Sequence, residues 1–298
     1  MTYKAIVIGG SGFIGSHLID CLIENNCQVL NIDNEWSLFN YQEKSCRTLI
    51  ISMLSDRFAD ILEHENKDAS VIYHLAGISG IQDCIENSEK AVQVNVAGTI
   101  KILEKIKNNK EAFFVFSSSL YADSDVSGIY GITKRVCEDL IKFYHKQYGL
   151  NYIIFRIGTV YGSRANHHNS MANLIRSALK TKKISYYGTG EETREYIHVA
   201  DVAKALVDFA INEKYWNQTY ELTGTHPTKA KDMINLIKEL LGDEYKVEFR
   251  NEKVINHYNV TPMQFKQNIV KKYIPDVCCS LSSGLYSLIK EIANEESS

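Results

Sequence analysis

The sequence is poor in proline and has no segment of linker-like composition. Only three of its 298 residues are proline, and no stretch rich in proline or serine divides the chain. Long hydrophobic runs are also missing, because the longest, 112–116, is far shorter than the ~18 residues that a membrane helix needs. The N-terminal MTYKAIVIGG enters a strand pattern directly, so we expect no signal peptide. We therefore expect a chain whose parts pack directly on one another.

An excess of charge of one sign is absent as well. The 33 Lys and Arg residues nearly balance the 36 Asp and Glu residues, which leaves a net charge of -3. This balance predicts no nucleic-acid partner and no membrane surface as a partner. A content of 45% hydrophobic and 23% charged residues is typical of an ordinary globular protein. The length predicts one or two domains.

Paired cysteines and a metal-binding pattern are missing too. The seven cysteines are scattered, with no CxxC pair and no histidine spacing that would complete a zinc site. His167 and His168 are adjacent, and neighbours in a strand point to opposite faces, so they would rarely share one metal ion. We expect reduced thiols, a cytoplasmic location and no metal site.

Apolar runs alternate with helical segments through the first half of the chain. Such runs, separated by helices, are typical of a parallel sheet with right-handed crossovers. We predict an α/β fold with a doubly wound parallel sheet of the Rossmann type. The expected strands are 4–8, 27–32, 48–54, 70–75, 112–116 and 151–158, and the expected helices are 12–25, 57–65, 89–108 and 130–148.

The regular alternation of strand and helix segments ends after residue 162. Helices are expected at 170–181, 198–212, 229–241 and 276–293, and strands at 184–187 and 219–223. We predict a first, dinucleotide-binding domain over 1–162, to which the helix 198–212 and neighbouring segments return. Residues 163–190 and 220–298 would form a smaller, mixed α/β substrate-binding domain.

Three glycines lie between the first strand and the first helix. Gly9, Gly12 and Gly15 form a GxxGxxG pattern in which bare backbone permits a tight turn, close approach of a pyrophosphate and close helix–strand packing. Asp33 ends the next strand, where a carboxylate accepts both ribose hydroxyls of an adenosine. The pattern predicts dinucleotide binding, with NAD favoured over NADP. The alternative is a glycine-rich turn with Asp33 as a simple turn residue.

Tyr130 and Lys134 lie one helical turn apart, so their side chains share a face. An ammonium close to a phenol favours the phenolate and lowers the phenol pKa from its usual value near ~10. Such a tyrosine can take a proton from an alcohol or return it to a ketone. Ser119, at the end of the fifth strand, could hydrogen-bond the same oxygen. A second YxxxK, formed by Tyr286 and Lys290, lies on the last helix, and we interpret it as structural.

Together these motifs resemble the extended short-chain dehydrogenase/reductase family, in its NAD-dependent nucleotide-sugar epimerase/dehydratase group, and are similar to UDP-glucose 4-epimerases. The resemblance extends to about residue 225. The matching segments are GGSGFIGSHL at 9–18, YHLAG at 73–77, NVAGT at 95–99, FVFSSS followed by YGITK, RIGTVYG at 156–162 and YYGTGEETREYIHVADVA at 186–203.

The resemblance implies roles for individual residues. The catalytic residues would be Ser119 (with Ser118 as the alternative), Tyr130 and Lys134. Arg194 would bind the diphosphate of a nucleotide sugar, for which a planar bidentate donor is suited, unless it is simply a surface arginine among acids. Thr159 and Ser119 would also contact the substrate. The cofactor would contact Gly9, Gly12, Phe13, Ile14, Gly15, Asp33, Asn34, Met53, Leu75, Ala76, Gly77, Asn95, Ser117, Tyr130, Lys134, Ile157 and Val160.

Four departures from the family pattern stand out. The third-strand segment has Ile51-Ser52-Met53 where an Asp is usual, so an adenine contact there would come from backbone or from Met53. Only 11 positions separate Ser119 from Tyr130, about half the usual spacing, which predicts a shortened loop over the sugar. Thr159 replaces the usual Asn. Finally, SSSLY offers no carboxylate beside the catalytic hydroxyl, which disfavours 4,6-dehydration and decarboxylation.

These features favour C4 epimerisation of a nucleotide hexose through a transient 4-keto sugar. A 4-ketoreductase acting on a 4-keto-6-deoxysugar nucleotide, with NADH or NADPH, is the alternative enzyme. A dinucleotide-binding sensor without turnover is the alternative of another class. The resemblance also implies a homodimer formed by the helices near 89–108 and 130–148, whose apolar stripe could instead face the sheet. The positions concerned are Ile100, Leu103, Val136, Leu140 and Phe143.

Overall fold

The computed structural model describes residues 3–35, 45–124, 128–250, 270–273 and 279–296. By its internal contacts the chain forms two compact units. The first consists of Met1–Ile157 and Ala203–Glu221, and the second of Gly158–Val202 and Leu222–Ser298. The start of the predicted helix at 276–293 lies outside the described residues. Among the described residues, no helix is long and apolar enough to cross a membrane.

A parallel sheet forms the centre of the first unit. Its strands follow the order β11-β6-β5-β4-β1-β2-β3, and the neighbouring pairs from β6 to β3 are parallel. This order, in which the chain reverses direction beside β1, confirms the doubly wound prediction. The strands are β1 (Lys4–Ile8), β2 (Gln28–Asp33), β3 (Cys46–Ile50), β4 (Val71–His74), β5 (Phe113–Ser119), β6 (Asn151–Ile157) and β11 (Gln218–Leu222).

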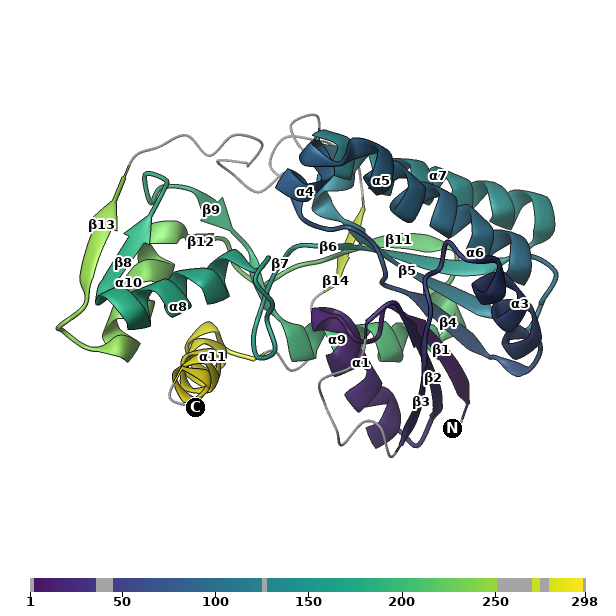
Figure 1. Ribbon diagram of the computed structural model, residues 1–298, viewed down its shortest axis with the longest axis horizontal. Coiled ribbons are helices and arrows are strands. Elements are labelled where there is room, and N and C mark those ends of the chain that lie inside the picture. The colour runs from purple at the N-terminus through teal and green to yellow at the C-terminus, as the bar shows by residue number, and fades with distance from the viewer. Residues whose placement is uncertain (1–2, 36–44, 125–127, 251–269, 274–278, 297–298) are drawn as a thin grey trace. The chain divides into compact units, whose positions relative to one another are not determined.

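Helices cover both faces of this sheet (Figure 1). The helices α3 (Asp56–Glu65), α6 (Gly98–Ile106) and α7 (Gly128–Tyr148) pack one face of the strands into a single hydrophobic core. The helix α1 (Phe13–Glu24) lies on the opposite face. Because successive strand residues alternate between faces, the continuous apolar runs in the sequence correspond to strands buried on both sides.

The predicted helix 89–108 is wrong as one uninterrupted α-helix. The segment contains α5 (Ser88–Val92), a π-helical turn η2 (Gln93–Ala97) and α6, and a short helix α4 (Ile81–Glu86) precedes it. The π turn contains Asn95, whose main-chain oxygen accepts a hydrogen bond from the Thr99 hydroxyl at 2.6 Å. Helical periodicity alone cannot reveal a single widened turn, and such turns are frequent at functional sites.

Other element limits differ by a few residues. The strand β3 ends at Ile50 rather than at 54, whereas β5 continues through the three serines to Ser119. The short helical turn η3 (Leu120–Asp123) follows directly. The serines are therefore part of the sheet edge, which fixes the alternation of their side chains.

Within the described residues, the second unit contains short strand pairs and three helices of its own. The parallel pairs are β7 (Thr159–Tyr161) with β10 (Tyr196–His198) and β8 (Lys183–Tyr186) with β13 (Lys246–Phe249). The antiparallel pair is β9 (Thr193–Arg194) with β12 (Thr228–Lys229). The helices are α8 (Ser170–Thr181), α10 (Ala230–Leu241) and α11 (Leu281–Glu295); α9 (Val199–Ala210) begins here and continues into the first unit. The strands β13 and β14 (Lys271–Tyr273) are short and polar, so no apolar run predicts them.

Candidate active site

The loop between β1 and α1 has the form of a phosphate-binding turn. Gly9 has φ +92°, and a Cβ there would lie 2.4 Å from the Ala76 nitrogen. A Cβ on Gly15 would lie 2.2 Å from the Gly9 carbonyl oxygen, whereas one on Gly12 would meet that oxygen at 3.5 Å. Gly9 and Gly15 are therefore required by backbone packing, and Gly12 borders open space.

The N-terminus of α1 lies beside this open space. Among the described residues, no side chain caps α1, and its first turn, which begins with the half-buried Phe13 and Ile14, contains no acid. A helix start of this kind presents free N–H groups and a positive dipole end to an anion. These features fit the pyrophosphate of a dinucleotide.

The Asp33 carboxylate is held at the end of β2. It accepts hydrogen bonds from the backbone N–H groups of Ser11 (2.8 Å) and Asn34 (2.8 Å). Burial raises the pKa of this carboxyl above its ordinary value, although the backbone hydrogen bonds act in the opposite direction. The structure thus places the acid beside the phosphate loop, where an adenosine ribose of NAD would be held.

The segment after β4 forms a second wall of this region. Leu75 and Ala76 both donate backbone hydrogen bonds to the Ile8 carbonyl, at 2.8 and 2.9 Å. The Asn95 side chain binds both backbone groups of Ile78. Its Oδ1 accepts the Ile78 N–H at 2.8 Å, and its Nδ2 donates to the Ile78 carbonyl at 3.0 Å. Gly77 passes so close that a Cβ there would lie 2.9 Å from the Asn95 Oδ1.

Met53 has a different environment from the one expected. It is only 8% exposed and belongs to the hydrophobic core. A Cβ on Gly98 would lie 2.9 Å from the Met53 sulfur, so the thioether packs against α6. Little of this side chain remains for an adenine, and Ser52 is the exposed residue of the segment.

Ser119, Tyr130 and Lys134 are brought together in the first unit. The Ser119 hydroxyl lies near the Tyr130 phenol and acts to lower the pKa of the phenol. Lys134 lies one turn further along α7, and its Nζ donates to the Ser117 carbonyl at 2.7 Å. All three residues are less than 10% exposed, which places a phenol, a hydroxyl and an ammonium in a dry environment.

Burial, rather than the ammonium, dominates the protonation of this group. It raises the pKa of Tyr130 to about 12, although the Ser119 hydrogen bond acts to lower it. Burial also lowers the pKa of Lys134. The predicted lowering of the phenol pKa by Lys134 is therefore not found for the protein residues alone, because desolvation penalises both charged forms.

The three serines of β5 have different surroundings. Ser118 points to the face opposite Ser119, and its hydroxyl donates to the Glu138 carboxylate at 2.6 Å. Ser117 is half-buried, and its carbonyl is the acceptor for Lys134. Because Ser118 is engaged with Glu138 and Ser119 is the serine that influences the Tyr130 phenol, Ser119 is favoured over Ser118 as the partner of Tyr130.

A buried charge network adjoins these serines, and the sequence analysis missed it. The Arg156 guanidinium donates to Glu138 at 2.9 and 2.8 Å and forms an ion pair with Asp123. The Arg156 and Glu138 side chains are 9% and 1% exposed. The available signal was a charge inside an apolar strand, together with an acid eight positions after Tyr130 on the same helical face.

The remaining predicted residues lie at or beyond the end of β6. Ile157 is buried at the end of this strand. Thr159, Val160 and Arg194 belong to the second unit, where Thr159 and Val160 pair with Tyr196 and Ile197. Arg194 is half-buried in β9, and its Nη1 donates to the Thr193 carbonyl at 2.9 Å.

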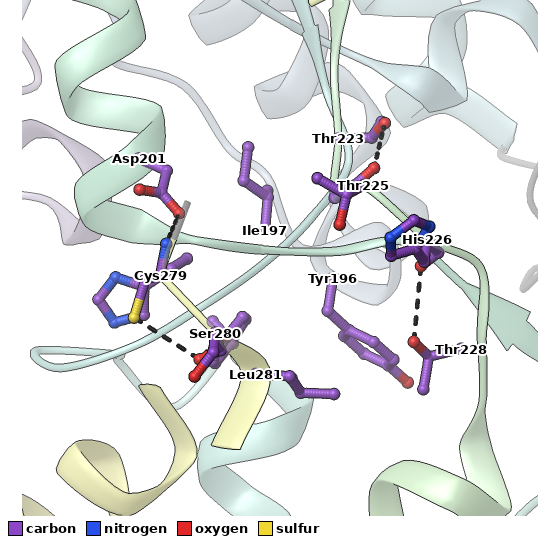
Figure 2. Close-up of a pocket in the computed structure, with 13 residues that line it drawn as sticks. Tyr196, Ile197, Asp201, Thr223, Thr225, His226, Thr228, Cys279, Ser280 and Leu281 are labelled. Carbon is purple, nitrogen blue, oxygen red and sulfur yellow. Dashed lines mark hydrogen bonds between the residues drawn. The ribbon is translucent and has the colours of Figure 1, made fainter. Parts of the chain in front are cut away.

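The second unit also contains a cavity of about 300 Å³. Figure 2 shows the residues that line it, among them Tyr196, Asp201, Thr225, His226 and Cys279. The Asp201 carboxylate accepts the Cys279 backbone N–H at 2.8 Å and so ties the start of α9 to the chain before α11. None of the predicted site residues is among the residues that line it. Within the described residues, no His, Cys, Asp and Glu side chains form a cluster that could hold a metal ion.

Known proteins show the same combination of fold and motifs. A sequence profile of the NAD dependent epimerase/dehydratase family matches residues 5–221. A Methanocaldococcus jannaschii protein named "Putative UDP-glucose 4-epimerase" is 31% identical over 267 residues, which cover 84% of each chain. A UDP-N-acetyl-alpha-D-glucosaminuronate decarboxylase of Bacillus cytotoxicus is 27% identical over 277 residues, which cover 86% of this chain and 84% of the relative.

A solved structure agrees over almost the whole length. The crystal structure of the UDP-glucuronic acid 4-epimerase from Bacillus cereus, in complex with UDP-glucuronic acid and NAD, matches with a TM-score of 0.84 and 25% identity. The match covers 98% of this chain and 99% of that one. The expected NAD cofactor is confirmed at the level of the family. The chain is an enzyme that belongs to the NAD dependent epimerase/dehydratase family.

Proposed function

We propose that the protein is an NAD-dependent nucleotide-sugar epimerase that inverts C4 of a hexose through a transient 4-keto sugar. The observation that supports this most is the grouping of the buried Ser119, Tyr130 and Lys134, in which the Ser119 hydroxyl acts to lower the pKa of the phenol. The segment Ser117–Ser124 contains a single carboxylate, Asp123. That carboxylate is engaged with Arg156.

The proposed chemistry follows from the properties of these side chains. NAD, when bound, supplies the hydride acceptor. Tyr130 takes the O4 proton of the sugar and later returns it, which is the task of a general base and acid. Ser119 donates a hydrogen bond that favours the ionised phenol. We assign Lys134, one turn further along α7 with its Nζ on the Ser117 carbonyl, the role of supplying a positive charge on the same helical face.

The paired carboxylates weigh against the other reactions of the family. Dehydration and decarboxylation would need a free acid or base beside the catalytic hydroxyl. Two carboxylates of the adjoining elements η3 and α7, Asp123 and Glu138, are both engaged with Arg156. A decarboxylase among the relatives keeps that chemistry within the family, and the pairing of the carboxylates is our reason for preferring epimerisation.

The substrate is proposed to be a nucleoside-diphosphate sugar. The half-buried Arg194 is the residue we propose for the diphosphate, because its guanidinium is a planar bidentate donor. Thr159 and Val160 would lie near the sugar and the nicotinamide. The similarity to UDP-sugar epimerases favours a uridine nucleotide.

A 4-ketoreductase is the second candidate, because the 11 positions between Ser119 and Tyr130 leave a short loop that would suit a small deoxysugar. Incubation with UDP-glucose, UDP-GlcNAc and a 4-keto-6-deoxy nucleotide sugar, with and without NADH or NADPH, separates the two. Epimer formation without added cofactor supports the proposal. Consumption of reduced cofactor with the keto sugar supports the reductase. Bound NAD without turnover of any substrate would indicate a sensor.

Substitution Tyr130→Phe provides the first prediction. Removing one hydroxyl deletes the proton carrier, so turnover should fall by at least ~10²-fold. NAD affinity should change little, because the phosphate loop and Asp33 are untouched. Discontinuous activity assays measure the loss of turnover, and titration with NAD followed by protein fluorescence measures the cofactor affinity. Loss of NAD binding in this variant would contradict the role given to Tyr130.

We also propose that the enzyme is a homodimer. Large apolar side chains remain exposed along α5–α7, including Val92 (42%), Ile100 (36%), Val136 (39%) and Phe143 (53%). Leu103, by contrast, is fully buried, and Leu140 packs against the core. Of the positions in the predicted stripe, Leu103 and Leu140 therefore face the core. Ile100, Val136 and Phe143 are exposed and remain available for a partner subunit.

A further inference from the structure

The buried charge network connects three segments that are distant in the sequence. Arg156 comes from β6, Glu138 from α7 and Asp123 from η3. Glu138 also accepts the Ser118 hydroxyl, and Ser118 is the register partner of Arg156 in the sheet. Two carboxylates therefore flank one guanidinium, and Lys142 approaches Glu138 from the surface at 3.7 Å. Charges this deeply buried persist only when they are paired.

The same network holds the turn that follows Ser119. Asp123 ends η3 and is bonded to Arg156. Arg135, on the next turn of α7 after Tyr130, donates to the carbonyls of Ala122 at 2.7 Å and Ser124 at 3.2 Å. One short turn of backbone is thus held by two arginines, one from the sheet and one from the helix that contains Tyr130.

The position of the η3 turn determines how the Ser119 hydroxyl is oriented. The backbone N–H of Tyr121 donates to Ser119 Oγ at 3.2 Å. A hydroxyl has one proton to donate, and an Oγ that already accepts this N–H keeps its own proton for another acceptor. We assign the Tyr130 oxygen as that acceptor, because the nearby Ser119 hydroxyl acts to lower the phenol pKa.

We propose that Asp123, Arg156 and Glu138 are positioning residues for the reaction, acting through the η3 backbone to hold the Ser119 hydroxyl toward Tyr130. None of the three touches the reacting atoms. Their effect passes from Arg156 to Asp123, from the η3 backbone to Ser119 Oγ, and from there to the phenol. The assignment of a catalytic role to Tyr130 rests on the proposed function, but the geometry of the chain of contacts does not.

The expected consequence is a change in the ionisation of Tyr130. Without the restraint on η3, Ser119 loses part of its donation to the phenolate, and a hydrogen bond to a charged group corresponds to a shift of about one pH unit. In the variant Asp123→Asn, the pH at which kcat is half-maximal should rise by about one unit. At neutral pH, kcat should fall about tenfold with KM nearly unchanged. Asp123→Glu, which retains the charge, should restore most of the profile.

Asp123 is the suitable position because its side chain is 23% exposed, whereas loss of Arg156 would leave the 1% exposed Glu138 as an uncompensated buried charge. Glu65→Gln is the matched control. Glu65 is 11% exposed and bonds Lys4 and Arg47 at 2.9 and 2.8 Å, and both of these residues lie outside η3. This control should lose stability without any shift in the pH profile.

A readout without turnover separates this inference from the proposed function. Tyrosine labelled with ¹³C at Cζ gives one resonance per residue, and Tyr130→Phe identifies the signal of Tyr130. At neutral pH, Asp123→Asn should move that signal in the same direction as Ser119→Ala, and Glu65→Gln should leave it in place. An unchanged signal and an unchanged pH profile in Asp123→Asn would overturn the inference, as would equal changes in Glu65→Gln. If the wild type turned over no nucleotide sugar, the proposed function would be wrong. The ¹³Cζ resonance of Tyr130 would still test the positioning role of Asp123.

Discussion

At the scale of single residues, burial determines which side chains are charged. Tyr130 and Lys134 are both pushed toward their neutral forms. A buried phenol with a pKa of about 12 is almost entirely protonated at neutral pH, so the proposed reaction depends on every donor that favours the phenolate. This is why we propose that the orientation of the Ser119 hydroxyl affects the rate.

His74 lies at the end of β4, and burial disfavours its charged form, the imidazolium cation, as well. The ring is 1% exposed, its Nε2 is bonded to the Thr99 hydroxyl at 2.9 Å, and its Nδ1 has no hydrogen-bond partner among the described residues. Burial and then the Lys134 charge lower its pKa to about 3. The ring is therefore neutral in the folded protein at every pH at which the enzyme would work.

This predicts a loss of stability in acid. Below pH ~6.5 the unfolded state binds a proton at His74 that the folded state refuses. The free energy of unfolding should therefore fall as the pH drops from 6.5 toward 3, by up to about 5 kcal/mol from this residue. Urea unfolding at a series of pH values measures the slope. In His74→Gln the slope should be shallower.

The exposed His64 supplies the control for this prediction. Its side chain is 82% exposed, so His64→Gln should leave the acid slope as it is in the wild type. Equal slopes in the wild type and in His74→Gln would show that His74 does not govern acid stability. The lower absolute stability expected of His74→Gln does not affect the comparison, because the slope is the measured quantity.

At the scale of elements, Gly15 and Gly12 of the phosphate loop require glycine for different reasons. In Gly15→Ala the new methyl group would lie 2.2 Å from the Gly9 carbonyl oxygen, so the loop or the helix must shift. In Gly12→Ala the nearest atom lies 3.5 Å away, which is ordinary contact. The first substitution therefore affects the fold, and the second occupies space that a pyrophosphate would use.

We accordingly expect different outcomes for the two variants. Gly15→Ala should lower the melting temperature by several degrees, as a strained or overpacked site does. Gly12→Ala should keep the wild-type melting temperature and weaken NAD binding by about tenfold or more. Differential scanning calorimetry and NAD titration measure the two quantities. A Gly12→Ala protein that binds NAD normally would show that the pyrophosphate does not approach this residue.

The elements that could be predicted from the sequence are those whose signal is local. The glycine pattern before α1, the apolar strands and the helix of Tyr130 are each visible in a few consecutive residues, and the doubly wound order followed from their alternation. The π turn at Asn95 and the ion pairs of Arg156 could not be predicted in this way. They depend on contacts between segments 17 to 38 positions apart, such as Asn95 with Ile78 and Thr133, which periodicity does not encode. The pKa of Tyr130 was mispredicted because burial is a property of the packed structure.

At the scale of the whole molecule, α7 has two roles on opposite faces. Its inner face supplies Tyr130, Lys134 and Glu138 to the candidate site and the core, and these residues are buried. Its outer face exposes Ile132 (51%), Val136 (39%) and Phe143 (53%). Helical periodicity places Val136 and Phe143 seven positions apart, on one stripe.

The dimer proposal predicts that charge on this stripe produces monomers. Each exposed apolar side chain favours burial by about 25 cal/mol per Å² of surface, and a carboxylate in an apolar interface would have no partner to offset its desolvation. The variant Val136→Glu/Phe143→Glu should sediment as a monomer at micromolar concentrations at which the wild type is a dimer.

Ile211→Glu is the matched control for the stripe. Ile211 is 58% exposed but lies outside α5–α7, so its substitution adds charge to the surface without reaching the proposed interface. Sedimentation velocity on the three proteins, with circular dichroism to confirm that each is folded, decides the question. A wild type that sediments as a monomer, or a folded double variant that remains dimeric, would show that this stripe is not the interface. A dimer lost only in the double variant would mean that the helix bearing the proposed catalytic tyrosine is held from both sides, by its own sheet and by a second copy of the chain.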